Sequence, residues 1–448
     1  CKSKNIVRES DVLDTWFSSA LWPHSTLGWP DNTDDLAYFY PTSVMETGYD
    51  ILFFWVARMI MMGIENMGDI PFKSVYLHGL VLDPDGVKMS KTRGNVLNPL
   101  ELVDDYGADA VRFALTTGNS PGKDMRLNEQ KLEASRNFAN KLWNASRFVI
   151  AKLPESSNLD SWYKPNPTHL QDRWILSRLN CVSGQVRQYM NEYQFGEAQR
   201  IIYEFLWGEY CDWYIEMAKV RMSSMENPKS CPVPTLVYVL ERILRLLHPF
   251  MPFVTEEIWQ TLVSKLPVEP DMPKALIVAS YPEENRIMIC EQSEDQMAVI
   301  TEIVRSVRNL RAEFRIQESQ HLKAIVCTPG FEDLLKSEST TVNFLARVEL
   351  ITKDVVDRID SSKNHVSLVL KNGTITVLLE SLVDTESEKK RLHLEINELD
   401  IHRNRLMDRL RDKNFLNKAP ELVVEQERQR LIEMDGRRNR IKEIISSL

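Results

Sequence analysis

The spacing of hydrophobic and polar positions divides this chain into four segments. In the first, up to about Asn119, short apolar runs alternate with amphipathic stretches. Residues 41–47 form a strand-like run, and residues 50–65 have the period of an amphipathic helix that Asp50 is placed to cap. Residues 73–82 are almost continuously apolar, which is typical of a buried parallel strand. This pattern predicts an α/β segment.

Turn and helix-cap motifs also occur in this segment. Residues 83–86 (DPDG) predict a turn, and Asn98 followed by Pro99 predicts the start of a helix. From about Asn128 the spacing becomes that of long helices, with connectors that contain proline and serine between them. This second segment is predicted to be an all-α bundle, with helices at residues 128–150, 170–193, 195–221 and 233–248 and another from Thr255.

The last two segments differ again. Between about Glu283 and Asp384, one amphipathic helix precedes short strand-like runs, two of which are joined by a hairpin turn at residues 371–373 (KNG). After that small α+β unit, two heptad-patterned helices flank a loop that contains Pro420, which predicts an antiparallel coiled-coil hairpin. The predicted domains are therefore residues 1–127, 128–282, 283–384 and 385–448.

Composition bounds what such a chain can be. With 448 residues, 43% of them hydrophobic and 27% charged, the chain has the make-up of a globular protein of several domains. Its longest apolar stretch, residues 51–62, is too short to span a bilayer and contains Arg58. The six cysteines are dispersed without a C-x-x-C pair, which favours buried thiols in a reducing compartment over a disulfide framework or a zinc cluster. No metal-ligand set is predicted.

The net charge of −9 does not exclude a nucleic-acid partner, because binding depends on where positive charge lies. Residues 386–448 carry 15 Lys and Arg against 13 Asp and Glu, a balance of +2, so the remainder stands at −11. The tail is thus the more basic end of the chain.

The most specific motif is residues 86–99 (GVKMSKTRGNVLNP), which contain Lys88, Met89, Ser90 and Lys91. The string resembles the KMSKS signature of class I aminoacyl-tRNA synthetases, with Thr92 in place of the final serine. The resemblance implies that these residues bind ATP, with Lys88, Ser90 and Lys91 in catalytic roles. Lysine suits that task, because two ammonium groups on a mobile loop can meet the charge that develops on departing pyrophosphate. His78 and Gly79, upstream of the loop, resemble the family's adenosine-binding step.

A second resemblance concerns the amino-acid pocket. Residues 46–55 (ETGYDILFFW), taken with residues 14–19 (DTWFSS), look like the pocket of valyl-tRNA synthetases. The resemblance implies that Asp50 binds the substrate ammonium and that Trp16, Ile51 and Trp55 bound a small branched side chain. An ammonium group in a half-dry cleft needs a carboxylate partner, which agrees with this assignment. Isoleucyl enzymes have a more polar string at this place, which is the main reason to prefer valine.

Two further resemblances reach the rest of the chain. Residues 205–219 and 247–259 look like the anticodon-binding domain of the valine, isoleucine and leucine enzymes, although most of the aromatic residues there are expected to be core. The carboxy-terminal hairpin resembles the coiled-coil arm that ends valyl enzymes. Its arginines either track RNA phosphates or occupy ordinary coiled-coil flanks; the candidates for tRNA binding are Arg403, Arg405, Arg409, Arg411, Arg437 and Arg438.

The expected fold is thus multidomain: the carboxy-terminal half of a Rossmann-type nucleotide-binding domain, then the anticodon-binding bundle, the α+β unit and the arm. The resemblance implies ATP-dependent activation of valine and transfer to tRNA(Val) by a monomer, with ATP as substrate and Mg²⁺ accompanying it. No H-x-G-H string occurs, and the chain starts CKSK without methionine, so we expect a piece that is inactive alone and has no editing domain. A cytoplasmic location is expected, or an organelle if a leader was removed.

Three alternatives remain open from the sequence. An isoleucyl enzyme would share the fold and the lysine loop. A non-catalytic, tRNA-binding or regulatory derivative of a synthetase would explain the missing H-x-G-H string. A coiled-coil scaffold would explain only the tail.

Overall fold

The structure is a computed structural model that describes residues 5, 7–90, 92–153, 162–165, 167–223, 231–267, 272–317, 319–351, 365–378, 385–412 and 421–447. The chain divides into two compact units. The first comprises Cys1–Thr168, Ile175–Ile215 and Pro232–Ile289, and the second comprises His169–Trp174, Glu216–Cys231 and Cys290–Leu448. The described residues are mostly helical, with small sheets, and none of their helices combines the length and apolarity needed to cross a membrane.

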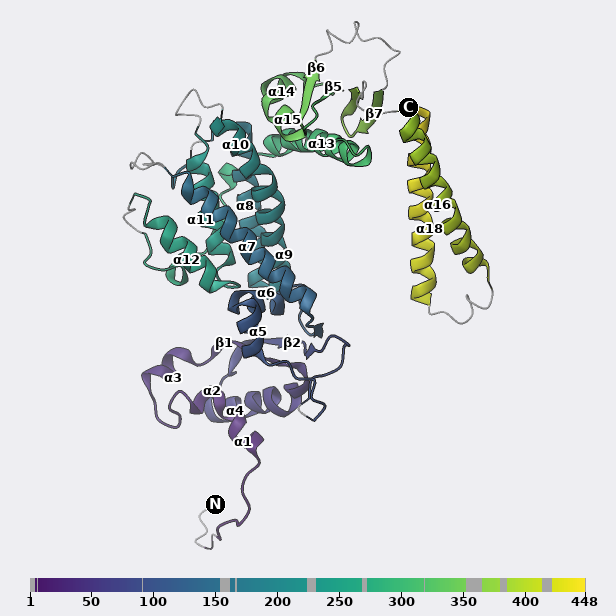
Figure 1. Cartoon of the computed structure of the whole chain (residues 1–448). Helices are drawn as coiled ribbons and strands as arrows, with labels where there is room; N and C mark the ends of the chain where they lie inside the picture. The colour runs from purple at the N-terminus through teal and green to yellow at the C-terminus, as the bar shows by residue number, and fades with distance from the viewer. Residues whose placement is uncertain are drawn as a thin grey trace. The chain divides into compact units, whose positions relative to one another are not determined.

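The first unit begins with a small α/β layer built around two parallel strands, β1 (Thr42–Gly48) and β2 (Phe72–His78), which lie side by side in Figure 1. A second parallel pair joins β3 (Val81–Leu82) to β4 (Met125–Arg126). The helices of this layer are α1 (Thr15–Ala20), α2 (Trp22–Ser25), α3 (Asp34–Phe39), α4 (Arg58–Met67), α5 (Pro99–Tyr106) and α6 (Ala108–Thr116). Asn98 caps α5, as predicted, by accepting a hydrogen bond from the amide of Leu100.

The prediction of one buried strand over residues 73–82 is wrong in two respects. The strand breaks after His78, and β3 resumes at Val81 because its neighbour changes from β1 to β4. It is also only half buried. Met45 and Phe72 pack with Val56 and Met59 of the helical segment that follows β1, whereas Val75 on β2 is exposed.

The predicted helix over residues 50–65 forms, but its first turns are not α-helical. A 3₁₀ turn at Tyr49–Ile51 leads into a π-helical stretch at Leu52–Ala57, and α4 follows. The prediction that Asp50 caps this helix is wrong. Gly48 occupies the capping position, and Asp50 lies inside the first turn, so its carboxylate is free to face another segment. Wide π turns are frequent at functional sites.

The rest of the first unit is helical, as predicted. The bounds are α7 (Glu129–Ala151), α8 (Leu170–Asn191, whose first turn belongs to the second unit), α9 (Phe195–Glu204), a π-helical stretch at Phe205–Tyr214, α11 (Val233–Leu247) and α12 (Pro252–Val263). Short 3₁₀ turns follow at Leu276–Val278 and Arg286–Met288. Helix α11 forms the centre of the core, since Leu240, Leu244 and Leu247 are fully buried.

The second unit contains α10 (Ile215–Ser223, from its second residue), the predicted α+β fold and the hairpin. Strands β5 (Leu322–Cys327), β6 (Val348–Ile351), β7 (His365–Leu370) and β8 (Gly373–Leu378) form one sheet in the order β6-β5-β8-β7, accompanied by α13 (Glu291–Glu313), α14 (Glu332–Ser337) and α15 (Ser339–Ala346). The β7–β8 turn is the predicted one. Strand β6 was not predicted, because four residues give too short a pattern.

The predicted coiled-coil hairpin is present as α16 (Thr385–Arg411) and α18 (Glu421–Ser447), which run side by side in Figure 1. Its polarity follows from cross-helix ion pairs, because Asp400, Arg403 and Arg409 on α16 meet Arg438, Asp435 and Glu427 on α18. From Asp400 to Arg409 along α16, the partner residues on α18 run backwards from Arg438 to Glu427, so the two helices are antiparallel. The predicted proline-containing connection lies at residues 413–420, outside the described residues.

Candidate functional site

The parallel pairing of β1 and β2 brings their carboxyl ends to one edge, with Gly48 opposite His78. At this edge, His78 Nε2 lies 3.4 Å from Glu46 Oε1. The other ring nitrogen, Nδ1, donates a hydrogen bond of 2.8 Å to the carbonyl oxygen of Gly79. The His78 imidazole therefore has the Glu46 carboxylate of β1 at one ring nitrogen and the carbonyl oxygen of Gly79 at the other.

Gly79 is required by the chain itself. A Cβ atom at this position would lie 1.8 Å from the carbonyl oxygen of Lys123, far inside van der Waals contact. The resemblance assigned Gly79 to an adenosine-binding step. The close approach in the structure is that of residues 122–125, which hydrogen-bond to Leu77 and Leu80.

Asp124 is a site residue that no sequence pattern singled out. Its Oδ1 accepts a 2.8 Å hydrogen bond from the amide of Leu80, and the hydroxyl of Tyr49 donates to the same oxygen over 3.2 Å. Partial desolvation, together with the neighbouring charges of Asp124 and Asp50, raises the pKa of Tyr49. Asp124 thus ties the pocket string at residues 46–55 to the segment that carries His78 and Gly79.

The lysine loop is held by two polar side chains, Asp83 and Asn95. Asp83 accepts from the amide of Val87 (2.7 Å) and from Asn95 Nδ2 (2.8 Å), and Asn95 Oδ1 accepts from the amide of Ser90 (2.9 Å). Hydrogen bonds from Asn95 and from the Val87 amide lower the pKa of Asp83. The hydroxyl of Ser90 lies 2.6 Å from that of Thr92. The predicted turn at residues 83–86 thus forms one end of a loop whose two sides are joined by hydrogen bonds from Asp83 and Asn95.

Lys88 and Asp50, which the sequence assigned to different substrates, meet in the structure. Lys88 Nζ lies 3.4 Å from Asp50 Oδ2, with the two side chains 62% and 41% exposed. An ion pair this exposed contributes little to stability, so the lysine is not locked in place. Met89 beside it is half-buried, and Lys91 lies outside the described residues.

The predicted apolar pocket residues come together on α1 and the helical stretch after β1. The ring of Trp16 lies 5.9 Å from that of Phe54, and Trp55 Nε1 donates a 3.0 Å hydrogen bond to the carbonyl oxygen of Ser19. Trp16, Ile51 and Trp55 are all half-buried. Trp55 also packs against the cluster around Met59, so its ring has a structural role as well.

The aromatic motifs of the helical bundle are mostly core, as the sequence suggested. Tyr210, Tyr214 and Trp259 are buried, and the hydroxyl of Tyr210 donates to the carbonyl oxygen of Leu236. Burial raises the pKa of Tyr210 well above its ordinary value. Phe253 is the opposite case, being 65% exposed at the start of α12.

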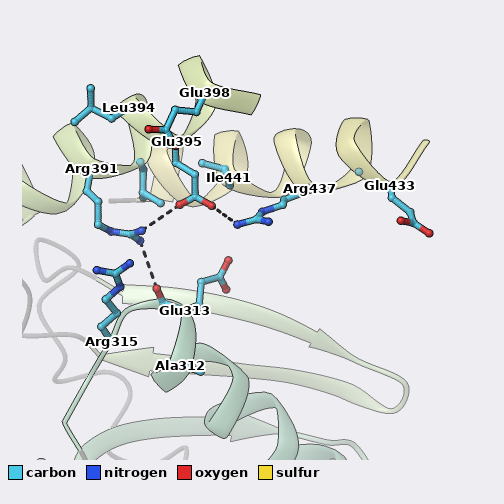
Figure 2. Close-up of a pocket in the computed structure, with 12 residues that line it drawn as sticks. Ala312, Glu313, Arg315, Arg391, Leu394, Glu395, Glu398, Glu433, Arg437 and Ile441 are labelled. Atoms are coloured by element: carbon cyan, nitrogen blue, oxygen red, sulfur yellow. Dashed lines mark hydrogen bonds and ion pairs between the residues drawn. The ribbon is translucent and has the colours of Figure 1, made fainter. Parts of the chain in front are cut away.

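Four of the six hairpin arginines are engaged within the hairpin. Besides the three cross-helix pairs given above, Arg437 Nη2 lies 2.6 Å from Glu395 Oε1. Figure 2 shows this pair beside a cavity of about 900 Å³, where Arg391 also reaches Glu395 and donates to the carbonyl oxygen of Glu313. Arg405 and Arg411 are exposed, and the described residues offer them no ion-pair partner. The coiled-coil interpretation therefore fits Arg403, Arg409, Arg437 and Arg438.

Comparison with known proteins shows which family has these features. Residues 1–128 match the model for class I tRNA synthetases (I, L, M and V), and residues 172–326 match the anticodon-binding domain of tRNA ligases. Residues 384–448 match the valyl tRNA synthetase tRNA-binding arm. The valine–tRNA ligase of Dehalococcoides mccartyi is 50% identical over 438 residues, which cover 96% of this chain and 48% of that protein.

The chain belongs to the valyl-type class I tRNA synthetases. A second valine–tRNA ligase, from Carboxydothermus hydrogenoformans, is 44% identical over 96% of this chain and 48% of its own length. The chain therefore spans about half the length of the curated relatives it matches. Among solved structures, the ternary complex of Agrobacterium radiobacter LeuRS with tRNA and LeuAMS covers 83% of this chain and 42% of that one, with 17% identity and a TM-score of 0.51. That likeness shows the class I synthetase fold.

Proposed function

We propose that the protein to which this chain belongs is a valine–tRNA ligase, which condenses valine with ATP to valyl-adenylate and passes the acyl group to tRNA(Val). The observation that carries the proposal is the meeting of Asp50 and Lys88 at the carboxyl edge of β1 and β2. Open α/β sheets bind ligands at this edge. Asp50, whose carboxylate would bind the ammonium group of the amino acid, thus lies beside Lys88, whose ammonium group would face the phosphates.

The exposed ion pair suggests an order of events. Asp50 can balance either the ammonium of Lys88 or that of valine. When valine binds at Asp50, Lys88 is released toward the triphosphate, on a loop that Asp83 and Asn95 brace. Lys88 then stabilises the charge that builds on pyrophosphate, chiefly in the transition state. The half-buried rings of Trp16 and Trp55, with Ile51, limit the size of the amino-acid side chain.

The same proposal includes ATP as a substrate and Mg²⁺ as the ion that accompanies it. The described residues contain no group of three or more His, Cys, Asp or Glu that could hold a metal ion. Mg²⁺ would be carried on the phosphates of ATP, and His78 with Gly79 would face the nucleotide. The four domain boundaries, the monomeric state and the cytoplasmic or organellar location stay predictions from the sequence.

The isoleucyl alternative is disfavoured by the pocket string and by the match of the hairpin to a valyl arm. A non-catalytic derivative would have had no need to retain the braced lysine loop and the Asp50 carboxylate beside it. In the following experiment, a non-catalytic derivative would form no adenylate, and an isoleucyl enzyme would form it with isoleucine in preference to valine.

The test uses the complete parent protein with Lys88→Ala, and Lys73→Ala as a control, since Lys73 is exposed on β2. Adenylate formation is measured before the steady state. We expect Lys88→Ala to slow this step about 10²–10³-fold, by analogy with the loss of one preorganised donor, while valine binding changes little. An unchanged rate with only a raised KM for valine would refute the assignment of Lys88.

A further inference from the structure

One carboxylate oxygen joins the string assigned to valine to the string assigned to ATP. Asp124 Oδ1 accepts a hydrogen bond of 2.8 Å from the amide of Leu80 and one of 3.2 Å from the hydroxyl of Tyr49. Leu80 directly follows Gly79, which the proposed function places against the nucleotide. Tyr49 directly precedes Asp50, whose carboxylate would bind the ammonium group of valine. Asp124 thus contacts the neighbours of two substrate-binding residues.

The main chain on both sides of Asp124 is held in place. The amide of Gly122 donates to the carbonyl oxygen of Leu77 over 2.8 Å, and the amide of Met125 donates to the carbonyl oxygen of Leu80 over 2.9 Å. The Asp124 side chain therefore projects from a segment that hydrogen bonds fix at both ends. A change of this side chain alone leaves those main-chain hydrogen bonds intact.

The other end of the link is a turn that begins without a side-chain cap. The 3₁₀ turn Tyr49–Ile51 starts at Gly48, which has no side chain to accept from the first amides, and a π-helical stretch follows it. This turn carries Asp50, so the direction of the Asp50 carboxylate depends on how the turn is held. The Tyr49 hydroxyl lies 3.2 and 3.3 Å from the two carboxylate oxygens of Asp124, a contact that restrains the turn from outside.

Adenylate formation depends on such restraints, because its two substrates must be aligned as well as bound. A carboxylate oxygen of valine bonds to the α-phosphorus of ATP while the bond from that phosphorus to pyrophosphate breaks, and the electron pair leaves with pyrophosphate. A displacement of about 1 Å can slow a step of this kind about 10²-fold.

We propose that Asp124 is a positioning residue for adenylate formation, which aligns the turn that carries Asp50 with the strand end that carries Gly79, through Tyr49 and Leu80. The inference rests on the proposed function, which makes valine and ATP the substrates. It deepens that function by naming a residue that aligns the two substrates and touches neither.

The experiment uses the complete parent protein with Asp124→Ala and Asp124→Asn. Binding of valine alone and of ATP alone is measured at equilibrium, and adenylate formation is measured before the steady state. We expect Asp124→Ala to slow adenylate formation about 10²-fold and to leave each dissociation constant within about threefold of the parent value, because misalignment affects only the step in which the substrates meet. Asp124→Asn should recover most of the rate, since its amide oxygen can accept both hydrogen bonds.

Glu129→Ala is the matched control. Glu129 is an exposed carboxylate further along the same stretch of chain, at the start of α7. Its substitution should leave the rate of adenylate formation within about twofold of the parent rate, as surface changes away from a site do.

Tyr49→Phe tests the link itself, because it removes the hydroxyl and keeps the ring. Tyr49 is 39% exposed and Asp124 is exposed, so neither substitution disturbs the core. Tyr49→Phe should slow adenylate formation about tenfold, through loss of one hydrogen bond to a charged group. If the hydroxyl acts through Asp124, the double variant should be no slower than Asp124→Ala alone. Effects that multiply in the double variant would show that the two residues act independently, against the proposal.

Three results with Asp124→Ala would also overturn the proposal. An unchanged rate in the folded variant would show that alignment does not depend on Asp124. A dissociation constant raised about tenfold for one substrate, with the rate at saturation unchanged, would make Asp124 a ligand of that substrate. A lower denaturant midpoint with weaker binding of both substrates would assign Asp124 to the stability of the fold. Failure of the proposed function is detected separately, as absence of valine-dependent adenylate formation in the unmodified complete protein.

Discussion

Asn95→Ala should loosen the lysine loop without touching a lysine. Asn95 makes two short hydrogen bonds, from the Ser90 amide (2.9 Å) and to Asp83 Oδ2 (2.8 Å), and a longer one of 3.4 Å to the Lys88 carbonyl oxygen. At about 1 kcal/mol for each short bond, the substitution removes about 2 kcal/mol from the closed loop. The open population should therefore rise about thirtyfold, because 1.4 kcal/mol corresponds to a factor of ten.

Hydrogen exchange at the amides of Asp83 and Val87 measures this opening. These amides donate to the Val87 carbonyl and to Asp83 Oδ1, so the substitution leaves both with their partners. Their exchange accelerates only if the loop opens, in proportion to the open population. Asn98→Ala is the control, since it removes the cap of α5, at a cost of about 1 kcal/mol, outside the braced loop.

The expected pattern is fast exchange at Asp83 and Val87 in Asn95→Ala and parental exchange there in Asn98→Ala. If Asn95→Ala leaves the Val87 amide within about threefold of its parental rate, the two short bonds do not hold the loop closed. If both variants accelerate exchange equally, the effect comes from α5 and not from the loop.

Two other predictions follow from buried positions. His24 is fully buried, Asn66 donates to its Nε2, and desolvation lowers its pKa, so folding favours the neutral imidazole. In the unfolded chain, the His24 imidazole takes up a proton below about pH 6.5, so the stability of the protein should fall as the pH drops below that value. The denaturant midpoint of His24→Gln should depend less on pH in this range. Equal pH dependence of the midpoints of the parent and His24→Gln would contradict the prediction. Gly79→Ala should lower the free energy of unfolding, because its methyl group would overlap the Lys123 carbonyl oxygen, whereas Gly208→Ala, with open space around it, should raise stability by up to about 1 kcal/mol. Denaturant titration of both variants distinguishes this steric effect from a general intolerance of alanine.

Much of the architecture follows from local patterns. Helix starts at Asn98 and Asn128, the hairpin turn at residues 371–373 and the heptads of α16 and α18 are encoded within a few residues, so their elements are predicted correctly. The family resemblance also came from contiguous strings, and the comparisons confirm it. Such features are local because capping, turn geometry and helical periodicity involve neighbours in sequence.

Other features arise only when distant segments meet. Asp50 and Lys88 are far apart in sequence, and their contact depends on the end of β1 lying beside the loop after β3. Asp124 and Asn95 carry no motif, yet they hold Tyr49 and Ser90 in place, because hydrogen-bond partners are chosen by proximity in space. The same is true of Arg403 and Arg438. Their residue type allowed either phosphate binding or ion pairing, and the antiparallel register of α16 and α18 placed Asp435 and Asp400 opposite them. The sequence by itself thus determined most of the elements and the family. The tertiary structure decided where the strand after residue 72 breaks and which charges face one another.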